Sequence, residues 1–317
     1  MIFKNKMKPL TSLLFAAALA LSPFPSKAQR PYYYDPHQIE LKEADAVVLG
    51  VNAGIGCAFG VVPSIVRKNK VSRVLEDCLK GMLAGTVIYA GEKAAAHAST
   101  PGMGWAAKIL VGDGVSMREN LALGNGLFDR LAYDIGPVRV SLGTKEANSG
   151  KNVQWHLLPG SLVGIAANIA YRSDWNEKAT LYSGTIVFDY YRKGKFLLSE
   201  PSFAGITTGN VVTMNHHITA HTEDGGIGYT TPLHPHDFTQ AYNHEQIHAA
   251  QYREYGSLDL VLRFSDMYRK SMDTAHVSLG SDIVAMTLMS VPGGYPVAEF
   301  PARQLTVDTF YTKWVED

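Results

Sequence analysis

The chain has few of the patterns that mark nucleic-acid-binding, nucleotide-binding or repeat proteins. Its 29 basic residues balance 29 acidic ones, and a net charge of zero gives no reason to expect nucleic acid or an anionic surface as a partner. No segment is compositionally disordered, no internal repeat is present, and no nucleophile elbow or glycine-rich phosphate loop occurs. The 317 residues, 46% of them hydrophobic, are enough for one large domain or two small ones.

The N-terminus lacks a hydrophobic run long enough for a comfortable transmembrane helix. Residues 10–21 are apolar and follow a segment, residues 1–9, with three lysines and no acid. Small residues, Ser26 and Ala28, then occupy the two positions that a signal peptidase reads, and no lipid-accepting cysteine follows. We predict that residues 1–28 are a signal peptide cleaved after Ala28, and that the protein is exported to the periplasm or cell envelope. The alternative is an uncleaved N-terminal anchor.

The next region, residues 29–130, is predicted to be helical. Residues 44–66 are apolar and rich in small side chains, and residues 72–98 resume apolar helical spacing after a basic interruption. Glycines four residues apart let two helix backbones approach closely. These pairs are Gly50/Gly54, Gly56/Gly60 and Gly81/Gly85. We therefore predict a tight, glycine-rich helical hairpin that turns near residues 67–70.

Cysteine is scarce, and its two copies flank this turn. Cys57 and Cys78 lie about ten residues from it, one on each side, so a folded hairpin brings them to nearly the same height. In an oxidising compartment this spacing favours a disulfide. The alternative is a pair of buried free thiols that act as small hydrophobic residues.

The first arm of the hairpin permits a second interpretation. Residues 46–66 are long enough to cross a bilayer, and Asn52 is the only strongly polar side chain among them. Glycine, alanine and Pro63 make the run only moderately hydrophobic, which favours burial in a soluble core. Membrane association through 46–66 remains the alternative.

Residues 131–317 are predicted to form an α+β region that makes one compact unit with the helical region. A third helical stretch, residues 105–120, precedes it, and residues 161–171 favour a further helix. Short β-branched or aromatic segments bounded by glycine, asparagine or proline indicate strands. They are residues 138–142, 153–158, 185–191, 196–198 and 209–215. Segregation of strands from helices indicates a central, largely antiparallel sheet, followed by the motif helix and further helix.

The most informative motif is the H-E-x-x-H pentapeptide formed by His244, Glu245 and His248. Asp237 and Gln240 form a capping-box pattern, so we predict a helix from Phe238 to about Tyr255, with Gly256 just beyond it. Histidines four residues apart lie on one helical face and can reach the same metal ion. The face they share contains Ala241, His244, His248, Gln251, Tyr252 and Tyr255. The alternative is a surface helix whose two histidines are solvated and bind no metal.

The segment from Asn243 to His248 resembles the zinc-binding helix of the zincin metallopeptidases. Its continuation through Gln251 and Tyr252 resembles a group of exported bacterial proteins that carry H-E-x-x-H-x-x-Q-Y. The resemblance is sharp over about fifteen residues. It implies that His244 and His248 bind Zn²⁺ and that Glu245 is the general base.

A catalytic zinc needs a third protein ligand and an open position for water. The metzincin positions for glycine and the third histidine hold Gln251 and Glu254, so the chain does not resemble that group. Glu254 also lies about 120° around the helix from His248, and we discount it. The resemblance to gluzincins favours Glu299, within a proline-flanked P-V-A-E-F-P-A segment. The alternatives are Asp259, Asp266, Asp273, His276 and Asp282.

Histidines gather upstream of the motif. They are His216, His217, His221, His234 and His236. If the predicted strand at residues 209–215 lies beside the motif helix, one of these histidines could stabilise the oxyanion of a tetrahedral intermediate. The alternative, which we favour, is an exposed histidine-rich loop with no role.

The sequence thus favours an exported zinc metallohydrolase, a peptidase that acts on a peptide or protein substrate. The alternative is a non-catalytic envelope protein with structural zinc or none, packed or membrane-associated through the glycine-rich hairpin. A third hypothesis is an immunity, chaperone or assembly factor that has kept the fold and lost turnover. Substrate and oligomeric state are not encoded in any motif.

Overall fold

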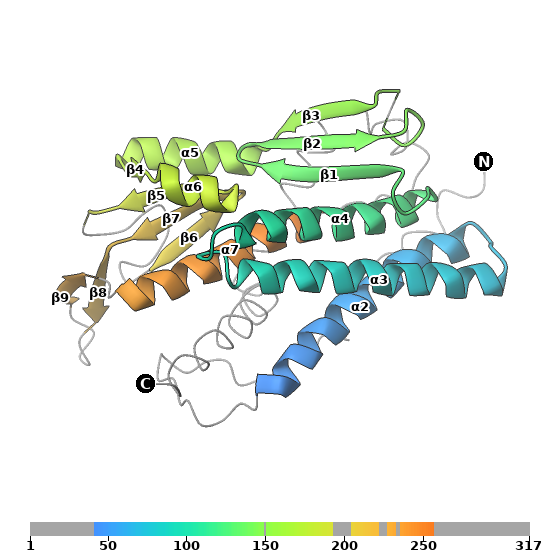
Figure 1. Cartoon of the computed structure of the whole chain (residues 1–317), viewed down its shortest axis with the longest axis horizontal. Coiled ribbons are helices and arrows are strands. Elements are labelled where there is room, and N and C mark those ends of the chain that lie inside the picture. Colours follow the sequence, from blue (N-terminus) through green and yellow to red (C-terminus); the bar gives the residue numbers. More distant parts are fainter. Residues whose placement is uncertain (1–40, 149, 193–203, 222–226, 233–234, 257–317) are drawn as a thin grey trace, which may run out of the picture.

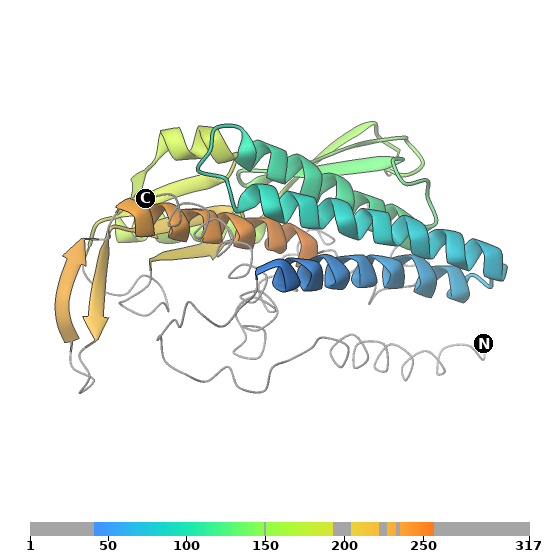
Figure 2. The same cartoon turned by 60° about the horizontal axis from the view of Figure 1, so that its bottom comes forward.

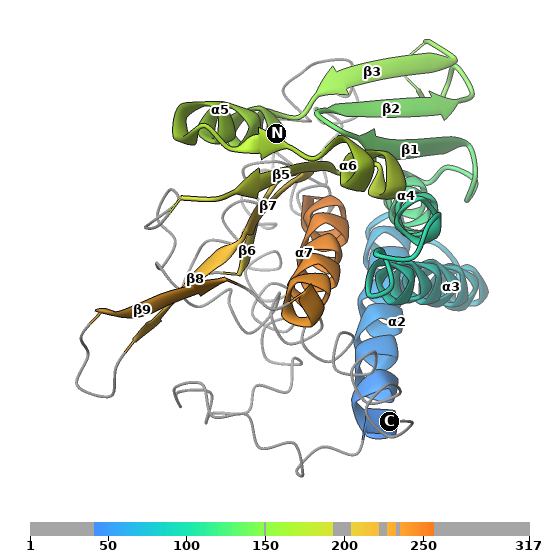
Figure 3. The same cartoon turned by 60° about the vertical axis from the view of Figure 1, so that its left-hand side comes forward.

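The computed structural model has an α+β fold, as the sequence predicts, and describes residues 41–148, 150–192, 204–221, 227–232 and 235–256. Three long helices come first, α2 (Leu41–Val66), α3 (Val71–Ala95) and α4 (Met103–Leu123), and they pack together as a helical layer (Figure 1). The helix that carries the histidine motif is α7 (Pro235–Gly256). It lies between this helical layer and a sheet formed by later strands (Figure 3).

The α2–α3 pair is an antiparallel hairpin whose two backbones are in direct contact (Figure 2). A Cβ atom added at Gly56 would lie 1.9 Å from the carbonyl oxygen of Gly81, and one added at Gly85 would lie 2.0 Å from that of Asn52. Only glycine permits this approach. The predicted pair Gly50/Gly54 differs, because an added Cβ there would meet nothing within 4 Å. That pair lies on the outer side of α2 and does not mediate hairpin packing.

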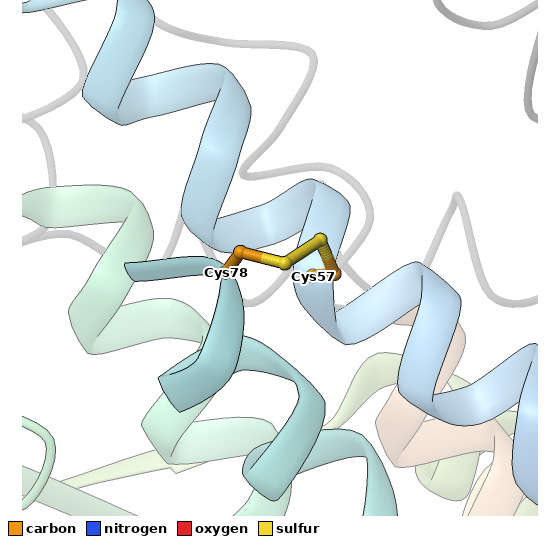
Figure 4. Close-up of a disulfide and its surroundings, with 2 residues drawn as sticks. All are labelled: Cys57 and Cys78. Atoms are coloured by element: carbon orange, nitrogen blue, oxygen red, sulfur yellow. A yellow bond between two sulfur atoms is a disulfide. The ribbon is translucent and has the colours of Figure 1, made fainter. Parts of the chain in front are cut away.

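A disulfide between Cys57 and Cys78 joins the two helices (Figure 4). Close backbone approaches lie near it, since a Cβ added at Gly56 or at Gly60 would lie 1.9 Å from a carbonyl oxygen of α3, that of Gly81 or Asp77. The glycines and the disulfide therefore fix α2 and α3 at one position along the hairpin. Among the described helices, only residues Ala46–Val66 of α2 are long and apolar enough to cross a membrane by length and composition.

The first sheet follows α4 and is an antiparallel meander. Its strands are β1 (Arg130–Ile135), β2 (Val138–Gly143) and β3 (Val153–Leu157), with β2 in the middle. The predicted strands at 138–142 and 153–158 correspond to β2 and β3, whereas β1 was not predicted. The sheet packs on α4 through the Ser116 hydroxyl, which accepts a 2.8 Å hydrogen bond from the backbone N–H of Ala132.

The second sheet has the strand order β4-β5-β7-β6. Its strands are β4 (Asp174–Trp175), β5 (Ile186–Tyr190), β6 (Gly205–Thr208) and β7 (Val211–Asn215). The pair β5–β7 is parallel, and the other described strand pairs in the chain are antiparallel. The predicted strands at 185–191 and 209–215 correspond to β5 and β7. The short edge strand β6 was not predicted.

A separate two-stranded ribbon, β8 (His217–His221) and β9 (Ile227–Pro232), precedes α7. The described strands form three sheets in place of one central sheet, and their pairing is largely antiparallel, as predicted. Two shorter helices follow the first sheet in sequence: α5 (Pro159–Tyr171) lies between β3 and β4, and α6 (Glu177–Ser183) lies between β4 and β5. The predicted strand at 196–198 and the helix expected after the motif lie outside the described residues.

Candidate metal centre

Helix α7 is held on two sides by apolar contacts. Ile247, inside the histidine motif, is fully buried in a cluster with residues of α3 and α4. Tyr242, one turn earlier, packs against β5 and β7 through Val187 and Val212. The helix begins at Pro235, three residues before the predicted start, and proline suits the first helical position because its missing N–H has no helical partner. These contacts fix the rotation of α7 and therefore the direction in which its histidines point.

His244 and His248 face one another along α7. Their Nε2 atoms lie 3.0 Å apart, and their rings are nearly perpendicular, at 88°. Two nitrogens bound to one tetrahedral zinc at 2.0–2.1 Å would be about 3.3 Å apart. The pair is therefore within a few tenths of an ångström of the separation that one zinc ion requires.

Gln251 is the hydrogen-bonding partner of His248 and favours one tautomer of its ring. Its Oε1 atom accepts a 2.9 Å hydrogen bond from Nδ1 of His248, and its side chain is completely buried. With the proton on Nδ1, the Nε2 atom of His248 carries a lone pair, the form a metal ligand needs. The arrangement has the form expected of a metal-binding histidine whose other ring nitrogen is held by a hydrogen-bonding partner.

Glu245 points toward the edge strand β6. The Thr207 hydroxyl donates a 2.7 Å hydrogen bond to Oε2 of Glu245, and it lies 3.0 Å from the Glu245 carbonyl oxygen. Gly205 makes room for this carboxylate, because a Cβ there would lie 2.5 Å from Cγ of Glu245. Glu245 itself is buried. Two residues of β6 that no sequence pattern marked, Gly205 and Thr207, therefore position the central glutamate of the motif.

The sheet edge beside the motif is β6 and not the predicted strand at 209–215. That strand, β7, is an interior strand, hydrogen-bonded to β5 on one side and β6 on the other. It still packs on α7 through Val212 and Met214. The outer side of β6 is the edge of the described sheet, next to Glu245.

Glu254 is not directed to the histidine pair. Its carboxylate accepts a 2.6 Å hydrogen bond from Arg118 of α4, and both side chains are buried. The sequence-based rejection of Glu254 as a ligand agrees with this geometry. Glu299 lies outside the described residues, as do the alternatives Asp259, Asp266, Asp273, His276 and Asp282. Within the described ranges, no group of three histidine, cysteine, aspartate or glutamate residues could hold a metal ion.

The opposite face of α7 carries a buried ion pair. Arg253 donates hydrogen bonds of 2.7 and 3.1 Å to the two carboxylate oxygens of Glu119, and Arg130 lies 3.5 Å away. Burial alone would raise the pKa of Glu119, but the two guanidinium groups outweigh it and lower that pKa to about 2. A cavity of about 20 Å³, room for one water molecule, lies on this same side beside Gln246. It is not a substrate site.

A second buried carboxyl group, that of Glu92, has a raised pKa, in contrast to the lowered pKa of Glu119. Burial and the neighbouring Glu254 raise the pKa of Glu92 well above its ordinary value, so Glu92 is held neutral. The Asn52 amide donates a 3.0 Å hydrogen bond to it, and Arg118 also donates to the Asn52 carbonyl oxygen at 3.0 Å. This network ties α2, α3 and α4 to the end of α7.

The upstream histidines do not form a second cluster among the described side chains. His216 stacks on Tyr191 at 4.3 Å between ring centroids and lies 3.0 Å from Asp189. His217 continues into β8, where its backbone N–H donates to Asn215. The side chains of His221, His234 and His236 lie outside the described set. His216 belongs to an aromatic contact near the start of α7, where Phe238 also packs on it.

Comparison of the chain with protein-family models, with curated proteins and with solved structures finds no match. The site is therefore interpreted from its own geometry.

Proposed function

We propose that the protein is an exported zinc-dependent metallohydrolase of the zincin type, resembling gluzincins, that cleaves a peptide or amide bond. The observation that carries this proposal is the convergence of the Nε2 atoms of His244 and His248, with Nδ1 of His248 hydrogen-bonded to buried Gln251. A solvated surface pair would have no need of a buried amide that selects the lone-pair tautomer. Glu299 is the proposed third ligand.

Zinc held by these residues would polarise the scissile carbonyl and make a water molecule acidic enough to attack it. Glu245 would take the proton from that water and deliver it to the leaving amine. The Thr207 hydroxyl holds Oε2 of Glu245, which fixes the carboxylate and leaves Oε1 to exchange the proton. The edge of β6 next to Glu245 suits an extended substrate, because an unpaired strand edge can hydrogen-bond a peptide backbone.

Export of the protein is part of this proposal. The predicted signal peptide, residues 1–28, supports it, and so does the Cys57–Cys78 disulfide, which persists in an oxidising compartment. The alternative proposal, a non-catalytic envelope protein, would keep the same hairpin and hold structural zinc or none. An open site with three protein ligands favours the enzyme, and four protein ligands favour structural zinc.

The zinc site is tested by metal analysis of purified protein. We expect one zinc per wild-type chain, loss of zinc in His248→Ala, and retention in the control His97→Ala, which removes an exposed histidine of the helical layer. Gln251→Leu should weaken zinc affinity about 10- to 100-fold because it removes the partner of a ligand. Glu299→Gln should lose zinc as His248→Ala does. Equal zinc in wild type and His248→Ala would refute the site.

Catalysis is tested separately with Glu245→Gln. This variant should keep zinc and lose about 10²- to 10⁴-fold in hydrolysis of a peptide library, the range expected for a missing general base. Zinc binding without hydrolysis in the wild type would support the non-catalytic alternative. Full hydrolysis by the zinc-loaded Glu245→Gln protein would exclude the proposed base.

A further inference from the structure

The α2–α3 hairpin carries an apolar face on the side away from its buried contacts. Leu75 and Leu79 of α3 are 61% and 66% exposed, although leucines at such helical spacing normally mark a core. The outer-face residues, named here as the hairpin face, are Val47, Val51, Ile65, Val71, Leu75, Leu79, Met82 and Leu83. At about 100° per residue, most of these side chains lie on the side of the hairpin that also carries the disulfide. The exposed apolar side chains of the two helices thus gather on the same side of the hairpin.

The hairpin cannot bury this face by adjusting itself. Rotation or separation of the helices is blocked where Gly56 meets Gly81 and Gly85 meets Asn52, backbone against backbone. The Cys57–Cys78 disulfide fixes the same level covalently. The hairpin face is therefore a rigid plate and not a loosely packed core.

Helix α2 is more apolar than its burial in the fold requires. Residues Ala46–Val66 reach a mean hydropathy of 1.8, yet only 33% of that window is buried inside the structure. A core helix of such composition would be mostly buried. Gly50 and Gly54 lie on the same outer side, where an added Cβ would meet nothing.

Basic residues lie at the turn end of the hairpin face. The turn and the start of α3, residues 67–73, contain Arg67, Lys68, Lys70 and Arg73. Arg67 donates to backbone oxygens at the end of α4, and Arg73 pairs with Glu76 and Asp77, so the lysines carry the positive charge at this end. Lys68 and Lys70 are exposed at the end of the plate. The balanced net charge of the chain conceals this local excess. An apolar plate with cations at its end matches a bilayer, whose acyl region takes the plate and whose anionic headgroups take the lysines.

We infer that the hairpin face docks flat on a lipid bilayer that contains anionic headgroups. The inference is independent of the zinc proposal, because no residue of the histidine motif contributes to the face. Docking would place the exported protein on a membrane surface and keep α7 and β6 on the side of the helical layer away from the lipid.

The test is co-sedimentation with phosphatidylcholine vesicles prepared with and without phosphatidylglycerol. The paired variant Leu75→Glu, Leu79→Glu removes the centre of the plate. Its matched control is Ile169→Glu, Leu181→Glu, which places the same charges at an isoleucine of α5 and a leucine of α6 that are 68% and 63% exposed. All proteins share one N-terminus, so residues 1–28 contribute equally, and circular dichroism checks that each variant is folded.

We expect wild type, the control pair and His248→Ala to bind phosphatidylglycerol vesicles, and the Leu75, Leu79 pair to lose binding. Lys68→Gln and Lys70→Gln should each weaken binding about fivefold, and only on vesicles with phosphatidylglycerol. Unchanged binding by the Leu75, Leu79 pair would overturn the inference. So would a wild type that binds neither vesicle, or a wild-type dimer that the leucine pair converts to a monomer without altering vesicle binding, because the face would then pair with a second copy.

Discussion

Gly54 and Gly56 lie two residues apart on α2 and respond to the same substitution in opposite ways. A Cβ added at Gly56 would lie 1.9 Å from the carbonyl oxygen and 2.7 Å from the carbonyl carbon of Gly81, both backbone atoms of α3. A Cβ added at Gly54 would meet nothing within 4 Å. Gly56→Ala and Gly54→Ala therefore differ only in whether the new methyl group enters the hairpin interface.

The magnitude follows from the distances. Ordinary contact begins at 3.4 Å, so Gly56→Ala requires the helices to separate by about 3.4 − 1.9 = 1.5 Å at that point. Gaps of 0.5–1 Å already forfeit a quarter to a half of each dispersion contact along the interface. Backbone cannot move aside as a side chain can, and the nearby disulfide resists separation. We expect a loss of about 3 kcal/mol, the upper end of the usual cost of overpacking.

Gly54→Ala should instead raise the free energy of unfolding by up to about 1 kcal/mol, because alanine is the better helix former in an exposed position. The assay is urea unfolding followed by circular dichroism, on both variants and wild type without reductant. The two variants should differ by about 4 kcal/mol, the sum of these two estimates. If Gly56→Ala were as stable as Gly54→Ala, the close backbone approach would be refuted.

Two further predictions concern the covalent and ionic contacts of the same helical layer. Replacing both Cys57 and Cys78 by serine should cost about 3 kcal/mol by the loop-entropy relation for a separation of 21 residues, and reductant should destabilise only the wild type in urea. Because the folded-state pKa of Glu119 is lowered from 4.5 to about 2, its contribution of about 3 kcal/mol is present above pH 4.5 and is lost as the pH falls toward 2. Thermal unfolding across that range should show the loss in wild type and not in the doubly neutral Glu119→Gln, Arg253→Met. The pKa of Glu92 is raised in the folded state, so Glu92 lowers the free energy of unfolding as the pH rises above 4.5. Glu92→Gln should remove that loss of stability. Unchanged pH profiles in these variants would contradict the assignments of Glu119 and Glu92.

The motif helix could be predicted because its information is local. The spacing of His244 and His248 fixes their common face once the segment is helical, and Gln251 lies on that face by the same periodicity. The helical start was misplaced by three residues, since Pro235 begins the helix and a capping-box pattern was read downstream of it. The position of a helix end depends on single contacts, whereas the set of residues that share a helical face follows from the regular helical spacing of the whole segment.

The contacts of Glu245 could not be predicted, because they come from a strand that leaves almost no sequence signal. β6 has four residues, Gly205–Thr208, and lacks the apolar alternation that marked the other strands. Gly205 and Thr207 acquire their roles only when β6 lies against α7. The parallel pairing of β5 with β7 is non-local in the same way, because a strand's own residues do not specify its neighbour.

The net charge of zero does not reveal the buried ion pairs or the basic turn at residues 67–70. Arg118 and Glu254 cancel in the count, yet they lie buried across α4 and α7, where breaking one partner would leave an uncompensated charge. Helix geometry alone predicts that Glu254 points away from the histidine pair. Its actual partner, 136 residues away in sequence, could not be read from that geometry.

The third zinc ligand decides how much of the proposal stands. In the proposed site, His244 and His248 would supply two ligands from one helix, whereas Glu254 is held by Arg118 and the Glu245 carboxylate is held by Thr207. No other described histidine, cysteine, aspartate or glutamate completes a group of three. The proposal therefore takes its third ligand from outside the described ranges, where Glu299 lies. If Glu299→Gln keeps full zinc while His248→Ala loses it, the gluzincin ligand set is wrong although the metal-binding pair is right. That result would leave a two-histidine site completed by another residue beyond Gly256, and the acids and the histidine between Asp259 and Asp282 would then be the ones to test.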